Sequence, residues 1–157
     1  MPSYDVRLSW PARVVLLESL TRADARDPFL RRLAREWRGN RGALDWARDV
    51  QRWFQQCVRF ERDELSGLPE VFRGPWEVFR SRRGDCDCQA RAVCALLTAG
   101  GVRCGLRYLL DGRQVPDHVV CVLVLGEKEI PLETTVAAGV GEHPDEAAER
   151  TMHGHAT

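Results

Sequence analysis

The spacing of hydrophobic residues predicts helices in the first half of the chain and strands in the second. A first helix begins near Pro11, because proline is favoured at the first helical position. A second begins at Asp27–Pro28, where the aspartate can cap the helix, and ends before Gly39. The third, from about residue 42 to 60, has the clearest helical spacing, carried by Leu44, Ala47, Val50, Phe54, Cys57 and Val58.

The segment 61–84, "ERDELSGLPEVFRGPWEVFRSRRG", interrupts this pattern with two prolines and three glycines. It predicts a long irregular connection, and connections of that length inside a compact domain are often functional. A short helix is expected next, over residues 85–99. Asp85 can cap its beginning and Gly100–Gly101 can end it.

After this helix the hydrophobic period changes to that of strands, over about residues 102–110, 118–125 and 129–136. A turn at Asp111–Gly112 and the short "GEK" connection suggest an antiparallel sheet. The chain is therefore expected to be an α+β protein. If Glu127–Lys128 is a two-residue turn, Glu133 opposes Val122 and shares a face with His118. The two would still lie roughly 13 Å apart along the strand, unless twist or a bulge brings them together.

At 157 residues the chain is expected to form a single domain, residues 1–157, and a polar, flexible tail is expected at 139–157. Lys+Arg and Asp+Glu both number 23, so the net charge does not indicate a nucleic acid or an anionic membrane as a binding partner. The beginning of the sequence does not resemble a signal peptide, and the longest apolar run is too short to span a bilayer. We therefore expect a cytoplasmic protein whose six cysteines are thiols.

Three residues stand in an order that suits nucleophilic catalysis. Cys86 begins the short helix, His118 begins a strand, and Glu133 lies on the next strand. A helix N-terminus lowers a thiol pKa, and Arg80, Arg82 and Arg83 add positive charge upstream. An imidazole can take the thiol proton while a carboxylate holds its tautomer. The sequence therefore predicts a Cys86–His118–Glu133 triad.

The two segments that carry these residues, "RRGDCDCQARAVCALLTAGGVRC" and "HVVCVLVLGEKEIPLETTV", resemble the transglutaminase-like core of the papain-like cysteine enzyme superfamily. The likeness is to its small bacterial and phage-encoded members and covers about residues 25–136. It implies N-terminal helices and a nucleophile-bearing helix packed on an antiparallel sheet. By this resemblance Cys86 is the nucleophile, His118 the base and Glu133 the acid, although the family usually has aspartate at the last position.

The resemblance implies acyl transfer at an amide bond of a peptide or protein substrate, through a thioester on Cys86. Water as acceptor makes the protein a peptidase or amidase, and an amine makes it a transglutaminase. The alternative is a non-catalytic, phage-type assembly or scaffold protein with the same fold. The sequence does not indicate an oligomeric state, and a side-chain oxyanion donor stays open among Trp53, Gln55, Gln56 and Trp76.

The remaining cysteines have a simpler interpretation. Cys88 is two residues from Cys86 on a helix, so the two side chains point apart and do not share a metal or a disulfide easily. No spacing matches a structural zinc site, so neither a metal nor a cofactor is expected. The other four, Cys57, Cys94, Cys104 and Cys121, are expected to be buried packing residues.

Overall fold

The computed structural model describes residues 10–61, 73–110 and 116–135. The expected tail at 139–157 and the turn at Asp111–Gly112 lie outside these residues. The helices are α1 (Trp10–Ala25), α2 (Pro28–Arg38), α3 (Ala43–Cys57), α4 (Pro75–Ser81) and α5 (Cys86–Ala99). The strands are β1 (Arg59–Phe60), β2 (Arg83–Gly84), β3 (Cys104–Leu110), β4 (Pro116–Leu125) and β5 (Lys128–Leu132). The expected α+β class is confirmed.

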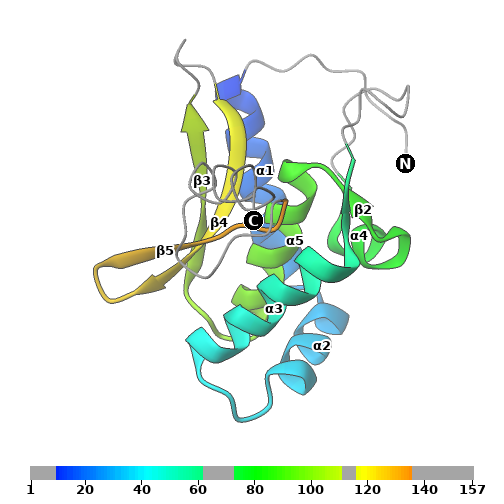
Figure 1. Ribbon diagram of the computed structural model, residues 1–157, viewed down its shortest axis with the longest axis vertical. Helices are drawn as coiled ribbons and strands as arrows, with labels where there is room; N and C mark the ends of the chain where they lie inside the picture. Colours follow the sequence, from blue (N-terminus) through cyan, green and yellow to red (C-terminus); the bar gives the residue numbers. More distant parts are fainter. Residues whose placement is uncertain (1–9, 62–72, 111–115, 136–157) are drawn as a thin grey trace, which may run out of the picture.

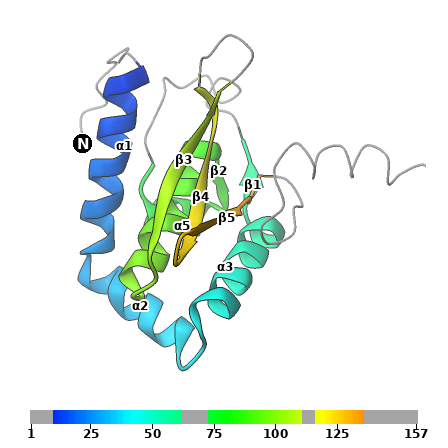
Figure 2. The ribbon, with the colours of Figure 1, turned by 90° about the vertical axis from the view of Figure 1, so that its left-hand side faces the viewer.

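Helix α5 lies at the centre of the molecule and carries the core. Ten consecutive residues, Cys88 to Leu97, are buried, as expected for a helix surrounded by other elements. It contacts α1, α2, α3 and α4 as well as strands β3 and β4. Figures 1 and 2 show the antiparallel sheet on one side of α5, and Figure 2 shows α1 and α3 on opposite sides of this helix–sheet pair. The expected packing of a central helix on an antiparallel sheet is therefore present.

Two local features determine where α5 begins and ends. Asp85 accepts a hydrogen bond from the backbone N–H of Cys88 at 2.9 Å, which is the capping contact that the sequence predicts. At the other end, a Cβ at Gly100 would lie 2.3 Å from the ring of Trp46. Glycine is therefore required where the end of α5 meets this fully buried tryptophan.

The sheet has the order β3-β4-β5 and both pairings are antiparallel. Leu125 pairs with Lys128, so the turn consists of Gly126 and Glu127 rather than Glu127 and Lys128. Gly126 has a φ of 62°, and a glycine readily adopts the positive φ that a tight hairpin turn demands. The expected register was therefore wrong by two residues, which matters for the placement of Glu133.

Two short elements lie in the region that was expected to be irregular. Helix α4 begins at Pro75, and β2 pairs in parallel with β1 through Arg59–Arg83 and Phe60–Gly84. The third helix ends at Cys57 instead of continuing to residue 60, because the chain leaves it to form β1. This parallel pair fixes the turn that leads into α5.

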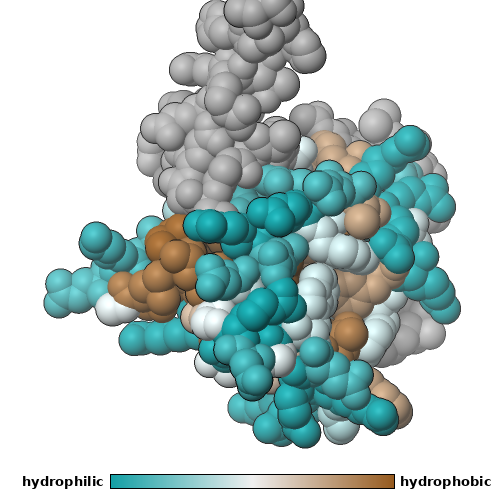
Figure 3. Space-filling model, turned by 60° about the horizontal axis from the view of Figure 1, so that its bottom comes forward, coloured by the Kyte–Doolittle hydropathy of each residue, from teal (hydrophilic) through white to brown (hydrophobic). Residues whose placement is uncertain are grey.

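The surface of the described residues is mixed. Figure 3 shows a face covered largely by hydrophilic residues, with hydrophobic residues gathered toward one side. Large hydrophobic side chains that are exposed are Val15, Phe29, Phe60, Trp76 and Leu125. Within the described ranges, no helix is both long and apolar enough to cross a bilayer.

Candidate active site

Cys86 is the first residue of α5, directly after the short strand β2. Gly84 lies so close to the helix that a Cβ added there would be 3.1 Å from the Cβ of Cys88. The buried amide of Gln89 donates a hydrogen bond to the carbonyl of Gly84 at 2.9 Å. The Gly-Asp-Cys turn is therefore held from inside the protein, by the cap of Asp85 and by contacts with the first turns of α5.

His118 and Glu133 meet directly. The Nε2 atom of His118 lies 2.6 Å from Oε2 of Glu133, although Glu133 comes just after β5 rather than within a strand. In the observed register Cys121 pairs with Leu132. If this register is extended by one residue, Glu133 lies two residues from His118 along β4 instead of the expected four. The gap of about 13 Å expected from the sequence is thereby halved, and the long glutamate side chain spans the rest.

The carboxylate of Glu133 is held from both sides. Its side chain is buried, and Oε1 accepts hydrogen bonds from the backbone N–H of Thr134 and from the N–H and hydroxyl of Thr135, at 3.0, 2.9 and 2.7 Å. Burial alone raises the pKa of Glu133, but the hydrogen bond and charge of His118, with the bonds from Thr135, outweigh it and lower this pKa below its ordinary value. Glu133 is therefore a fixed anion that orients the imidazole through Nε2.

Helix α3 positions the backbone of this acid. Gln51 and Gln55 each donate a side-chain amide N–H to the carbonyl oxygen of Glu133, both at 3.0 Å. They are four residues apart and so lie on one face of the helix. From the sequence, Gln55 was only one candidate for the oxyanion donor, and Gln51 was not identified as a functional residue. The described contacts make both of them positioning residues.

The other three candidates for an oxyanion donor have different surroundings, and Gln56 is exposed on α3. The ring of Trp53 contacts those of Trp37, Phe54 and Phe79 edge to face, so it belongs to an aromatic cluster. Trp76 is exposed and also contacts Phe79. The side-chain oxyanion donor stays unassigned.

Cys86 lies against strand β4 at the residue after His118. A hydrogen bond from the backbone of Val119 reaches the Cys86 sulfur and favours its thiolate. Burial nevertheless dominates: together with the charges of Asp87 and Asp85, it raises the pKa of Cys86 to about 12. The expectation that the helix N-terminus lowers this pKa below its ordinary value was therefore wrong, because desolvation and two adjacent carboxylates disfavour the thiolate.

The arginines upstream of Cys86 are engaged elsewhere. The guanidinium of Arg82 lies 4.7 Å from the ring centroid of Trp53, and Arg83 pairs with Glu61 at 3.6 Å. Arg82 also ends α4 in a left-handed conformation, with a φ of 59°. Arg82 and Arg83 therefore have partners other than the thiol, and burial, Asp87 and Asp85 dominate the pKa of Cys86.

The arrangement of helices and strands has counterparts among solved structures. A putative protease from Parabacteroides distasonis superposes with a TM-score of 0.61 at 13% sequence identity, over 78% of this chain and 26% of that one. A putative cysteine protease from Cytophaga hutchinsonii gives 0.59 at 17% identity, over 90% and 50% of the two chains. Legionella pneumophila LapG gives 0.55 at 16% identity, over 78% and 73%. The fold is therefore similar to that of cysteine-protease-like proteins.

These similarities concern the fold alone, since all the identities are low. The chain spans about a quarter of the length of the Parabacteroides protein and half of the Cytophaga protein. No protein-family model matches the chain, and no curated protein sequence does either.

Proposed function

We propose that the protein is a cysteine-dependent enzyme that transfers an acyl group from an amide of a peptide or protein substrate, through a thioester on Cys86. The single observation that carries this proposal is the 2.6 Å contact between His118 and a buried, ionised Glu133. A surface histidine has no need of a carboxylate fixed by three further hydrogen bonds. The contact of Cys86 with the backbone of Val119 brings the thiol to the strand that carries this imidazole.

In this proposal the two ring nitrogens of His118 have different roles. Nε2 donates its proton to Glu133, so the tautomer that results has an unprotonated Nδ1. Nδ1 takes the proton of the Cys86 thiol as the sulfur attacks the substrate carbonyl carbon. Because the pKa of this thiol is raised, proton removal by His118 accompanies the attack, and no stable thiolate precedes it.

The remaining steps restore the enzyme. Protonated His118 gives its proton to the leaving nitrogen, the C–N bond breaks, and the acyl group remains on Cys86 as a thioester. Water or a primary amine then attacks the thioester and gives up a proton to His118. The C–S bond breaks, and His118 returns that proton to the Cys86 sulfur. Water yields a peptidase or amidase, and an amine yields a transglutaminase.

One observation favours the alternative, a non-catalytic assembly or scaffold protein of this fold. The raised pKa of Cys86 describes a neutral, half-buried thiol, and a scaffold requires nothing else. The two candidate functions differ in whether the Cys86 thiol reacts when the protein is given substrates.

The test uses the full chain and a library of peptides derived from a bacterial proteome, with and without a biotin-labelled primary amine. An enzyme releases new peptide termini or attaches the amine to glutamine side chains, and mass spectrometry identifies both products. Cys86→Ser should abolish either product. Cys57→Ser changes a half-buried cysteine on α3 and should keep full activity.

The two product classes decide between water and amine as acceptor. If the wild-type protein and Cys86→Ser give the same product list, the enzymatic proposal is wrong and the scaffold candidate remains. Thioester capture on Cys86, seen as an acyl mass increment on its peptide, gives direct support.

A further inference from the structure

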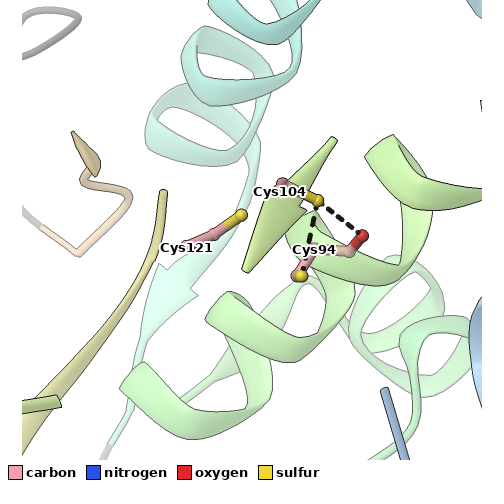
Figure 4. Close-up of side chains that lie close together, drawn as sticks. All are labelled: Cys94, Cys104 and Cys121. Carbon is pink, nitrogen blue, oxygen red and sulfur yellow. Dashed lines mark hydrogen bonds between the residues drawn. The ribbon is translucent and has the colours of Figure 1, made fainter. Parts of the chain in front are cut away.

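A second group of cysteines lies in the core and includes none of the residues of the proposed triad. Cys94 comes from α5, Cys104 from β3 and Cys121 from β4, so three elements distant in sequence supply one thiol each. Their sulfur atoms all lie within 4.8 Å of one another, and those of Cys94 and Cys104 are 3.4 Å apart. Figure 4 shows the three side chains close together, with the sulfur of Cys104 in contact with the sulfur and the carbonyl oxygen of Cys94.

This spacing suits a single metal ion. An ion bound to sulfur at about 2.3 Å holds its thiolates roughly 3.8–4.0 Å from one another. The three sulfurs need to move by less than about 1 Å to reach that arrangement. Three different elements therefore supply sulfur atoms that lie close enough together to bind one ion.

The donor set indicates the kind of ion. Three thiolates are soft ligands that select thiophilic ions such as copper(I) or zinc(II) over magnesium or calcium. Across residues 10–61, 73–110 and 116–135, these three form the one group of His, Cys, Asp and Glu side chains with metal-ligand spacing. Copper(I) is satisfied by three sulfurs, whereas zinc(II) would add a water or the hydroxyl of Thr98 as fourth ligand. That hydroxyl lies 3.1 Å from the sulfur of Cys104.

The site also has an entrance. Cys94 and Cys121 are buried, but Cys104 is half-buried and its neighbour Thr98 is exposed. An ion can therefore arrive from the side of Thr98 and reach Cys104 first. We propose that Cys94, Cys104 and Cys121 form a binding site for a soft, thiophilic d¹⁰ cation, copper(I) or zinc(II), which ties α5 to strands β3 and β4.

Binding converts the three thiols to thiolates and releases their protons to solvent, with no change in oxidation state. Because the ion binds the folded chain at a preformed site, it raises the stability of that state by mass action. Elements α5 and β4 also hold Cys86 and His118, but none of the three cysteines takes part in the proposed acyl transfer.

The experiment uses the reduced, chelator-treated full chain under nitrogen. Zinc(II) or copper(I) is added in separate titrations, with a chromophoric chelator as competitor to measure affinity. We expect one ion per chain, protection of three thiols from a thiol-reactive dye, and a rise in Tm of roughly 5–10 °C at a hundredfold excess over Kd. The ion that binds more tightly in the two arms identifies the preferred metal.

Matched variants locate the site. Cys104→Ser changes the half-buried ligand, and we expect it to weaken binding at least tenfold while the metal-free protein keeps its circular dichroism spectrum. Cys121→Ala should do the same, whereas Cys57→Ser and Cys86→Ser should bind the ion as the wild type does. If neither ion protects three thiols, or if Cys104→Ser binds unchanged, the proposal is wrong. Formation of a Cys94–Cys104 disulfide in air, without metal uptake by the reduced protein, would equally overturn it.

Discussion

The sulfur of Cys86 lies 3.7 Å from Oδ1 of Asp87, the next residue of α5. The other oxygen of this carboxylate lies 3.3 Å from the guanidinium of Arg13 on α1. The charge of Asp87 therefore adds to the larger effect of burial in favouring the protonated Cys86 thiol, and Arg13 partly compensates that charge. The pKa of the candidate nucleophile depends on a pair of residues that lies outside the triad.

Replacing Asp87 with asparagine should lower the pKa of Cys86, because a negative charge and a hydrogen-bond acceptor next to the thiol are removed. Arg13→Gln should raise it, because Asp87 then loses its cationic partner. Alkylation by iodoacetamide over a range of pH, with mass spectrometry of the Cys86 peptide, measures both midpoints. The wild type should label slowly at neutral pH. Midpoints that do not move in opposite directions would show that Asp87 does not control the thiol.

Glu133→Gln should lower kcat by about 10³–10⁴-fold, as expected when a base loses its correct tautomer. If the new amide N–H₂ faces His118, it forces Nε2 to accept and puts a proton on Nδ1, which can then no longer accept one from Cys86. In the opposite orientation the amide N–H₂ faces the N–H donors of Thr134 and Thr135, and two donors cannot form a hydrogen bond with each other. Glu133→Asp should also lose activity, because Oε1 is anchored and a shorter chain cannot reach His118. Full turnover by the glutamine variant would remove Glu133 from the mechanism.

The lowered pKa of Glu133 also predicts how stability depends on pH. Its folded pKa lies below the ordinary value of 4.5, so the ionised form stabilises the fold above that pH. This contribution is lost as the pH falls through the folded pKa. The difference in free energy of unfolding between wild type and Glu133→Gln should therefore be largest near neutral pH and shrink below pH 4.5. Urea unfolding from pH 3 to 7 measures it.

Glu129→Gln is the matched control for this measurement. Glu129 also has a lowered pKa, through its ion pair with Arg107, but it is exposed. Exposed ion pairs contribute little to stability, so the control should show a much smaller pH-dependent difference. An equal difference in both variants would mean that general surface charge, and not the buried contact with His118, causes the effect.

Much of the fold was predictable because its signals are local. Pro11, Asp27–Pro28 and Asp85 mark the beginnings of three helices through proline placement and capping, and the structure has all three. Helix α4 was missed although Gly74–Pro75 offers the same kind of signal, because seven residues are too few to show a hydrophobic period. The parallel pairing of β1 with β2 joins two-residue strands, which no sequence period reveals.

In the candidate site, too, the features with local sequence signals were predicted and those that depend on distant parts of the chain were not. The order of Cys86, His118 and Glu133 along the chain indicated which residues belong together. The expected hairpin register was wrong by two residues, and the observed register is the one that brings His118 and Glu133 into contact. The pKa of Cys86 could not be predicted, since burial depends on strand β4, which is distant in the sequence. The three-cysteine group was missed because residues 94, 104 and 121 are brought together by the packing of α5 on the sheet and not by any metal-binding spacing.

The last prediction concerns Gln51 and Gln55, whose amides both bond to the carbonyl of Glu133. Either alanine variant leaves one donor in place and should cost about 1 kcal/mol of the free energy of unfolding. The double variant removes both donors and should cost more than the sum of the single changes, because a buried carbonyl then loses both amide partners. Gln56→Ala, on the exposed side of the same helix, should have almost no effect.

If these residues act by positioning Glu133, the double variant should lower kcat and leave KM nearly unchanged, since the imidazole loses its orientation but the substrate keeps its contacts. Its pH–rate profile should also shift, because the Glu133–His118 contact sets the base. A merely structural role predicts lower stability with an unchanged profile. Urea unfolding and steady-state kinetics on the wild type, the two single variants, the double variant and the Gln56→Ala control separate the two outcomes. Strictly additive losses with a wild-type pH profile would contradict the assignment.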